Sequence, residues 1–294
     1  MTNNTRQAFR PRRSILYVPA SNTRAIDKAR SLPCDAVILD LEDAVAPEMK
    51  SAARDTAVAT LRVGGVGHRE VIVRVNALDT EWGQADMAAV SQSTVNAVLV
   101  PKVRTAGDVR AYNAALTGAA HAVRLWTMIE TALSIFRLEE IAAATCDTRL
   151  ACLVMGTNDL AKELHMTLDA QRAPLSALLG LSVAAARCHG LTVLDGVFND
   201  YDDAAGFAAQ CRQGMEFGFD GKTLIHPRQI ETCNAMFAPS PAAVSWAERV
   251  MAEFAKPENA QKGAIRLDGA MVERLHLAQA ERILALAAAL HHDR

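Results

Sequence analysis

The chain has 294 residues and a formal net charge of −2, with 50% hydrophobic and 22% charged residues. This composition is ordinary for a globular protein, and the length suits one barrel of about 250 residues with an appendage. A nearly neutral chain has no global field that would attract nucleic acid or an anionic membrane, and no apolar run approaches the roughly 18 residues of a membrane span.

The first 13 residues, MTNNTRQAFRPRR, are basic and lack the apolar stretch of a secretory signal, so we expect a loose tail over residues 1–13. The six cysteines form neither a CxxC pair nor a Cys/His cluster with zinc spacing. Scattered cysteines in predicted core segments are typical of reduced packing residues. We therefore expect a cytoplasmic protein.

Eight short segments rich in Val, Ile and Leu recur along the chain. Most are nearly continuous apolar runs, which are typical of strands buried on both faces. The segments are residues 14–20, 36–42, 71–76, 97–102, 124–130, 150–156, 192–198 and 218–225. Ala-rich stretches with helical spacing lie between them, as at 104–120, 131–144 and 173–189. Strand alternating with helix predicts a parallel sheet, and eight repeats favour a closed (β/α)₈ TIM barrel over the alternative, a doubly wound open sheet.

The pattern changes after the eighth segment. HPRQIETCNAMFAPSP predicts a helix ended by a Pro/Ser turn, and another helix is expected near 241–256. The short stretch AIRLDGAMVE then leads into an Ala/Leu-rich helix at about 273–290. We place the barrel at residues 14–238 and a C-terminal helical extension at 239–294. The extension is too small to be a separate domain, so we expect it to pack on its own barrel or on a neighbouring subunit.

Polar residues stand where most of the predicted strands end. The carboxyl ends of all strands of a TIM barrel share one face, and that face carries the chemistry. These residues are Asp40, Glu42, Asp43, Arg74, Asn76, Lys102, Glu130, Asn158, Asp159, Asp195 and His226. Charged residues at the ends of many strands together predict a functional site, whereas a charged residue at the end of one strand does not. His226, however, is by residue type more typical of a structural histidine.

Glu130 and Asp159 follow adjacent predicted strands and form a candidate metal site. Two neighbouring carboxylates repel each other unless a cation neutralises them. Oxygen ligands with room left for water and substrate suit Mg²⁺. The alternative is a rim salt bridge for Glu130 and a charge that favours the following helix for Asp159. Together at the rim, with Arg74 nearby, the two acids favour the metal site.

Arg74 lies in VIVRVN, an otherwise apolar strand, where a buried guanidinium needs an anion. Its planar fork suits a substrate carboxylate, and the alternative is a structural pair with Glu42 or Asp43. Asp40, Glu42 and Asp43 crowd one strand end in DLEDA. One or two of them are candidates to orient Arg74 or to hydrogen-bond water at the metal, and a solvated rim is the alternative.

Other motifs support no competing chemistry. The glycine-rich stretch at 64–67 precedes a strand, which is the wrong order for a dinucleotide-binding loop. No serine has a GxSxG setting, so serine-hydrolase chemistry is unsupported. Asp195 and Lys222 stand in turn-like DG and DGK stretches that fit a rim position equally well.

Several motifs together carry a family resemblance. SILYVPASNTRAIDKARSLPCDAVILDLEDAVAPEMKSAAR, VRVNALDT, VLVPKV, MIET, MGTNDLA and FDGKTLIHPRQI occur in this order. From about residue 13 to residue 285 the chain resembles the citrate lyase β-subunit-like proteins of the HpcH/HpaI aldolase superfamily. The resemblance implies a TIM barrel that forms a homo-oligomer, a trimer or hexamer. It also implies a carbon–carbon lyase for malyl-CoA, citramalyl-CoA or citryl-CoA, with oxaloacetate, pyruvate or glyoxylate as the 2-oxo acid.

By the same resemblance, Glu130 of MIET and Asp159 of GTNDL are ligands of Mg²⁺, with Mn²⁺ as the alternative ion. Glu130 also borders the substrate. Arg74 of VRVN is the catalytic clamp on the substrate carboxylate. Glu42 and Asp43 support the metal site from outside the ligand set.

Longer members of this family carry a C-terminal extension, swapped onto a neighbouring subunit, with a catalytic acid in a motif like GxMID. The matching stretch here is GAMVE, so the resemblance implies that Glu273 is the catalytic acid in place of the usual Asp. Its extra methylene can displace a base by about an ångström. Asn158 replaces a usual acid, and Leu133-Ser134 replaces a common Arg-Gly.

Three other functions stay open at this point. The first is a β subunit of a citrate lyase complex that acts on a carrier-protein thioester. The second is an acyl-CoA thioesterase that uses the same site. The third is a metabolite-binding scaffold without turnover.

Overall fold

The computed structural model describes residues 10–67, 69–120, 122–259 and 261–292. They form two compact units: Arg12–Phe237, and the described residues before and after that range. Residues 1–9 of the expected tail lie outside the described residues. Arg12 and Arg13, the last residues of that stretch, make ion pairs with Glu70 and Asp35, each at 2.7 Å.

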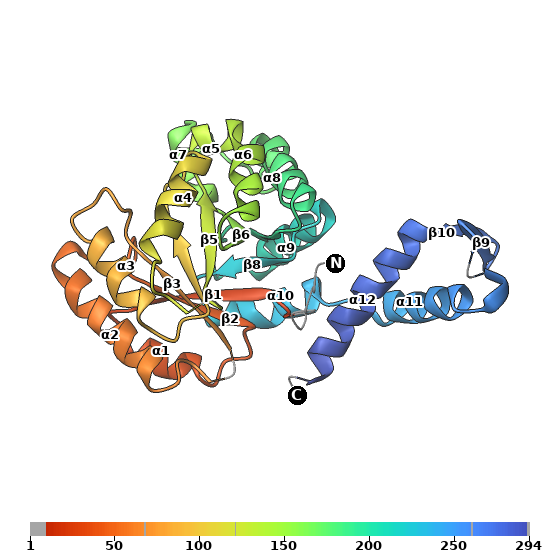
Figure 1. Ribbon diagram of the computed structural model, residues 1–294, viewed down its shortest axis with the longest axis horizontal. Helices are drawn as coiled ribbons and strands as arrows, with labels where there is room; N and C mark the ends of the chain where they lie inside the picture. Colours follow the sequence, from red (N-terminus) through yellow and green to blue (C-terminus); the bar gives the residue numbers. More distant parts are fainter. Residues whose placement is uncertain (1–9, 68, 121, 260, 293–294) are drawn as a thin grey trace. The chain divides into compact units, whose positions relative to one another are not determined.

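The first unit is built on a barrel of parallel strands (Figure 1). In the described part of the chain the eight barrel strands are β1 (Ser14–Pro19), β2 (Ala36–Asp40), β3 (Glu70–Arg74), β4 (Ala97–Val100), β5 (Arg124–Ile129), β6 (Leu150–Met155), β7 (Thr192–Asp195) and β8 (Gly221–Leu224). Each strand pairs with its neighbour in sequence, and β1 closes the barrel by pairing with β8. The predicted (β/α)₈ TIM barrel is therefore confirmed, with each strand at its expected place.

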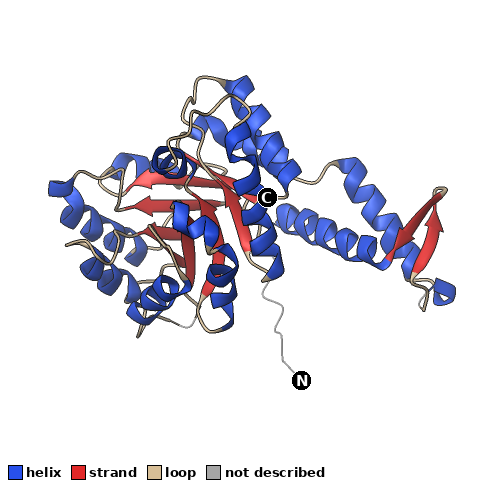
Figure 2. Cartoon of the chain, turned by 90° about the horizontal axis from the view of Figure 1, so that it is seen from above, coloured by secondary structure: helices blue, strands red, loops and turns tan. Residues whose placement is uncertain are grey.

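Helices surround these strands (Figure 2). They are α1 (Thr23–Ala29), α2 (Lys50–Arg62), α3 (Gly83–Ser91), α4 (Ala106–Ala115), α5 (Ala132–Phe136), α6 (Leu138–Ala143), α7 (Thr157–Glu163), α8 (Ser176–Cys188), α9 (Ala204–Phe217) and α10 (Ile230–Phe237). Local sequence sets several boundaries: Thr105 and Asp108 form a capping box before α4, and left-handed Gly218 ends α9. The helix expected at 131–144 is interrupted at Arg137, which has a non-helical φ of −116°.

The alternation of side chains along the strands decides which residues reach the barrel interior. An inner cluster fills the barrel and a larger outer cluster lies between strands and helices. Trp126 and Met128 of β5 belong to the inner cluster, so Glu130, two residues later, faces the same interior. Ile38 and Ile72 are also inner residues. The same period of two aims Asp40 and Arg74 at the mouth of the barrel.

The second unit has a small core of its own. It contains α11 (Pro241–Phe254), β9 (Ala264–Leu267), β10 (Ala270–Glu273) and α12 (Arg274–His292). The stretch AIRLDGAMVE forms an antiparallel hairpin, and Asp268 and Gly269 at its turn have φ values of +50° and +83°. Asp-Gly suits such a turn because both central residues need positive φ. Within the described residues, no helix has the length and apolar character needed to cross a membrane.

Candidate active site

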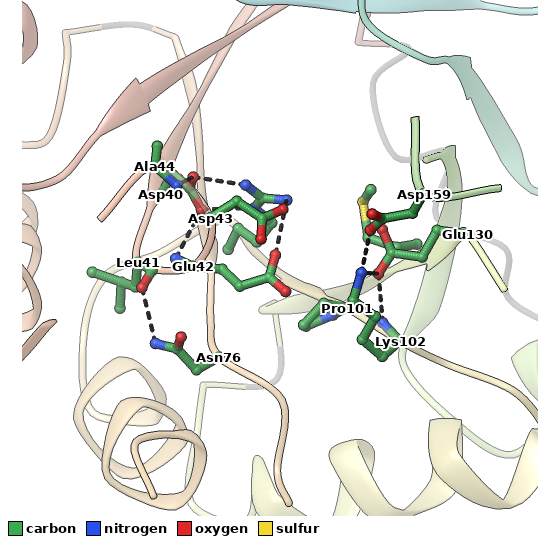
Figure 3. A network of polar contacts seen from close by, with 12 residues as sticks. Asp40, Leu41, Glu42, Asp43, Ala44, Asn76, Pro101, Lys102, Glu130 and Asp159 are labelled. Atoms are coloured by element: carbon green, nitrogen blue, oxygen red, sulfur yellow. Dashed lines mark hydrogen bonds and ion pairs between the residues drawn. The ribbon is translucent and has the colours of Figure 1, made fainter. Parts of the chain in front are cut away.

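Glu130 and Asp159 converge on a single cation, the ammonium group of Lys102 (Figure 3). Glu130 follows β5 directly and Asp159 lies in the first turn of α7, which follows β6. The Nζ atom of Lys102 lies 3.5 Å from Oε1 of Glu130 and makes a close ion pair with Oδ2 of Asp159. The backbone N–H of Lys102 also donates to Oε1 of Glu130 at 2.7 Å. Neighbouring strands thus bring the two predicted acids to one point.

Burial and neighbouring charges shift the pKa values of Glu130 and Lys102 in opposite directions. Burial raises the pKa of Glu130 to about 7, although the charge of Lys102 works to lower it. For Lys102, burial works against the charged form, but Glu130 and Asp159 outweigh it and raise the pKa above its usual value. The ammonium is therefore the counter-ion that stabilises two adjacent carboxylates.

Arg74 stands in a second group at the mouth and has several anionic partners. Its Nε and Nη2 atoms donate to the two oxygens of Asp40 at 2.6 and 2.7 Å. Its Nη1 atom lies 2.9 Å from Glu42 and 3.2 Å from Asp43, and its guanidinium lies over the ring of Tyr17 at 4.9 Å. Arg74 thus has the structural pairs with Glu42 and Asp43, but its two-pronged partner is Asp40. The sequence offered Asp40, Glu42 and Asp43 together as candidates to orient Arg74, and the structure gives the two-pronged contact to Asp40, which shares the inward parity of Ile38.

Glu42 is the acid of this group that burial perturbs most clearly. Burial raises its pKa to about 8, against the opposing charge of Arg74. Its Oε2 atom is close enough to Arg74 for an ion pair but is not aligned for a hydrogen bond with any described residue. Asp43, in contrast, has a largely exposed side chain. Figure 3 shows this acidic strand end and the Glu130 group on opposite sides of the same opening.

Asp195 and Lys222, which fit either a turn or the rim by sequence, belong to a buried cluster outside the barrel interior. Lys222 Nζ lies 2.9 Å from Asp195, and Arg172 lies 2.8 Å from the same carboxylate. A methyl group on Gly214 of α9 would lie 3.0 Å from Asp195, so this side chain faces the helix layer. Burial works to raise the pKa of Asp195, but Lys222 and Arg172 lower it. We interpret the cluster as a link between strands and helices.

Of the remaining predicted residues, His226 and Asn158 make hydrogen bonds with residues other than the two acids, and Glu273 lies in the second unit. His226 accepts a hydrogen bond from the backbone of Arg228 and stacks on Tyr201 at 4.6 Å, as expected for a structural histidine. Asn158 exchanges amide hydrogen bonds with Asn199 at 3.0 and 3.1 Å. Glu273 ends β10 in the second unit, where its backbone N–H donates to a histidine ring at 2.9 Å.

The donor set at Glu130 and Asp159 fits a hard divalent cation. Both side chains offer oxygen, and the structure already holds a positive group between them. Among the described residues no three His, Cys, Asp or Glu side chains form a metal-binding cluster. A pair of carboxylates suits Mg²⁺, which commonly keeps several waters and binds through one or two protein acids.

Comparisons with known proteins identify the family of this chain. The family model described as HpcH/HpaI aldolase/citrate lyase matches residues 13–227. A (3S)-malyl-CoA thioesterase from Cereibacter sphaeroides is 48% identical over 95% of this chain and 96% of its own. The human mitochondrial citramalyl-CoA lyase is 30% identical over 98% of this chain and 89% of its own.

A solved structure extends the likeness to three dimensions. The protein CitE from Mycobacterium tuberculosis, in complex with magnesium, acetoacetate and coenzyme A, has a TM-score of 0.74 and 30% identity. The match covers 94% of this chain and 97% of that one. The resemblance inferred from DLEDAV, VRVN and the later motifs is confirmed, and the chain belongs to the HpcH/HpaI aldolase/citrate lyase family.

Proposed function

We propose that this chain is a Mg²⁺-dependent lyase that cleaves a carbon–carbon bond in the CoA thioester of a hydroxy-dicarboxylic acid. Malyl-CoA, citramalyl-CoA and citryl-CoA are the substrates of this class. The observation that carries the proposal is the convergence of Glu130 and Asp159 on one cation at the barrel mouth. The relatives that act on malyl-CoA and citramalyl-CoA, and the relative bound to magnesium and coenzyme A, support it.

Each side chain of the site has a role in this proposal. Glu130 and Asp159 hold Mg²⁺, or Mn²⁺ in its place, and Glu130 borders the substrate. A bound Mg²⁺ ion supplies positive charge that makes the substrate hydroxyl easier to deprotonate. Arg74 binds the substrate carboxylate through N–H donors that its acidic neighbours leave free. Asp40 fixes the plane of the guanidinium, and that preorganisation lowers the entropy lost on binding.

The cleavage itself needs a base and an acceptor for the electron pair. We propose that Glu273, from an adjoining copy of the chain, takes the hydroxyl proton. The C–O bond becomes a carbonyl, the adjacent C–C bond breaks, and its electron pair passes to the thioester as an enolate that is then protonated. The products are a 2-oxo acid, either glyoxylate, pyruvate or oxaloacetate, and a shorter acyl-CoA. Positive groups at the mouth, such as Arg74, stabilise the developing charge.

Hydrolysis of the thioester is a second candidate function because the 48% identical relatives are (3S)-malyl-CoA thioesterases. The two activities give different products from malyl-CoA. The lyase releases glyoxylate and acetyl-CoA, whereas the thioesterase releases malate and free CoA. Chromatography of the products, with a thiol reagent to detect free CoA, separates the two reactions.

The metal site is tested by Glu130→Ala and Asp159→Ala. We expect either change to weaken Mg²⁺ binding strongly in calorimetry and to reduce turnover at least about 100-fold, because it removes one of the two proposed protein ligands. Glu216→Ala, which removes an exposed acid of α9, is the matched control and should behave as wild type. Full activity in both site variants, or unchanged activity of the wild type in EDTA, would rule out the proposed function.

A further inference from the structure

Lys102 reaches both acids of the site from an unusual backbone conformation. It follows β4 after Pro101, and its φ of +54° lies in the left-handed region that non-glycine residues rarely adopt. In this conformation its backbone N–H donates to Glu130 at 2.7 Å while its side chain extends to Asp159. One residue therefore contacts Glu130 through its main chain and both acids through its charge.

The ammonium lies between the two acids that we propose as metal ligands. Its contacts are Oδ2 of Asp159 and Oε1 of Glu130, the latter at 3.5 Å. A carboxylate oxygen that binds the ammonium this closely cannot also coordinate a metal from the same side. Two cations at this point would also repel each other. The ammonium of Lys102 and Mg²⁺ thus compete for this oxygen of Asp159.

We propose that Lys102 is an exchangeable counter-ion. Its ammonium holds Glu130 and Asp159 together in the metal-free protein and leaves them when Mg²⁺ binds. This inference rests on the proposed function, because it takes Glu130 and Asp159 as the metal ligands. The backbone N–H of Lys102 keeps its hydrogen bond to Glu130 in both states, since it orients Glu130 without occupying the space between the acids. The side chain is the mobile part, and it is 42% exposed.

The proposal fixes the direction of two measurable effects. Breaking the ion pairs of Lys102 opposes metal binding, so removing the ammonium should strengthen the affinity for Mg²⁺. It should also destabilise the metal-free protein, in which Glu130 and Asp159 would repel each other without a counter-ion. The metal-loaded protein should be little affected, because Mg²⁺ then neutralises both acids. If Lys102 had a purely structural role, its removal would lower the stability of the metal-free and the metal-loaded protein equally.

Lys102→Met tests these effects by calorimetry and thermal unfolding with Mg²⁺ as the probe. We expect the Kd for Mg²⁺ to fall by about fivefold or more, within the range typical of coupled sites, when it is measured at a pH well above the pKa of Glu130, which loss of the ammonium raises. The Tm of the metal-free variant should fall, whereas the Tm in saturating Mg²⁺ should match that of wild type. Lys102→Arg keeps a cation and should stay near the wild-type Kd. Lys162→Met, on the same helix as Asp159, is the matched charge control.

A second measurement uses the wild-type protein and does not depend on how a variant folds. Acetylation of lysines by a water-soluble ester, followed by mass spectrometry, reports how accessible each amine is. We expect the labelling of Lys102 to increase when Mg²⁺ is added and that of Lys162 to stay constant. Unchanged labelling of Lys102 would contradict the proposed displacement.

The outcomes separate this inference from the proposed function. If wild-type protein shows neither a binding heat nor a Tm change with Mg²⁺, the metal site itself is wrong. If wild type binds Mg²⁺ but Lys102→Met has an equal or weaker affinity, the metal site stands and the role of Lys102 is refuted.

Discussion

At the scale of single residues, the site combines acids whose pKa is raised by burial with cations whose charge works to lower it. Glu130 is 2% exposed, and Lys102 and Arg74 are the positive groups that lower its pKa against the effect of burial. Asp40 is the anionic partner that stabilises the charge of Arg74, which is itself buried. These pairings explain how charged side chains persist at the end of an apolar barrel interior.

The raised pKa of Glu130 predicts how metal affinity depends on pH. Because this pKa is about 7 in the metal-free protein, Mg²⁺ must displace a proton from Glu130 below that pH. The affinity for Mg²⁺ should fall by about tenfold per pH unit below about pH 7 and level off above it. Calorimetric titration across this range measures the effect.

Glu42 is the necessary control for this pH dependence because its own pKa is raised to about 8. In Glu42→Gln that titration is removed, and the affinity for Mg²⁺ should still level off near pH 7. An affinity that is constant down to the ordinary range of glutamate, near pH 4.5, would show that burial does not govern Glu130 in this way.

At the scale of secondary-structure elements, the close approach of the chain after β6 to the end of β5 positions Glu130. Gly156 follows β6, and its backbone N–H donates to the carbonyl of Ile129 at 3.0 Å. A methyl group at Gly156 would lie 2.4 Å from Cβ and 2.7 Å from Oε2 of Glu130. Glycine is thus required here by close approach to Glu130, since its φ of −96° is open to other residues.

Gly156→Ala should therefore displace Glu130 and weaken Mg²⁺ binding, with a loss of about 1–3 kcal/mol in stability from overpacking. Chemical unfolding and calorimetry measure the two effects. Gly180→Ala in α8 is the control, because the added methyl meets Phe217 at an ordinary 3.9 Å and favours the helix. If Gly156→Ala bound Mg²⁺ like wild type, the position of Glu130 would not depend on this contact.

At the scale of the whole molecule, the proposed catalytic groups are divided between two compact units. Arg74, Glu130 and Asp159 belong to the barrel unit, and Glu273 belongs to the C-terminal unit. Glu273 stands at the end of a hairpin whose register is fixed by its Asp-Gly turn. We propose that a homo-oligomer completes the site when one copy supplies Glu273 to the barrel of another.

Mixed oligomers test this arrangement. Glu273→Gln should lower kcat by about 100-fold or more and leave the affinity for Mg²⁺ unchanged, because it removes a base and no metal ligand. Coexpression of Glu273→Gln with Glu130→Ala should restore part of the activity, since some sites then combine an intact barrel with an intact Glu273. Coexpressed chains that stay as inactive as either variant alone would contradict a shared site, and a near-normal rate in Glu273→Gln would remove Glu273 from the role of base.

The sequence by itself determined the barrel and the region of the chemistry. Repeated apolar runs separated by helical stretches specify parallel strands buried on both faces, and this local pattern is independent of distant contacts. The position of Glu130 at the end of such a run identifies it as a rim residue. Asp159, after the next strand, and Arg74, in an otherwise apolar strand, were associated with Glu130 from their positions, and the family motifs implied the same residues.

Only the tertiary structure decided which charges meet. Arg74 pairs with Asp40 across 34 residues, and Lys102 reaches Glu130 and Asp159 across 28 and 57 residues. Such contacts depend on barrel closure and on strand register, and a shift of one residue turns a strand-end side chain from the interior to the helix layer. For that reason the sequence could not tell that Asp195 faces the helices while Glu130 faces the mouth.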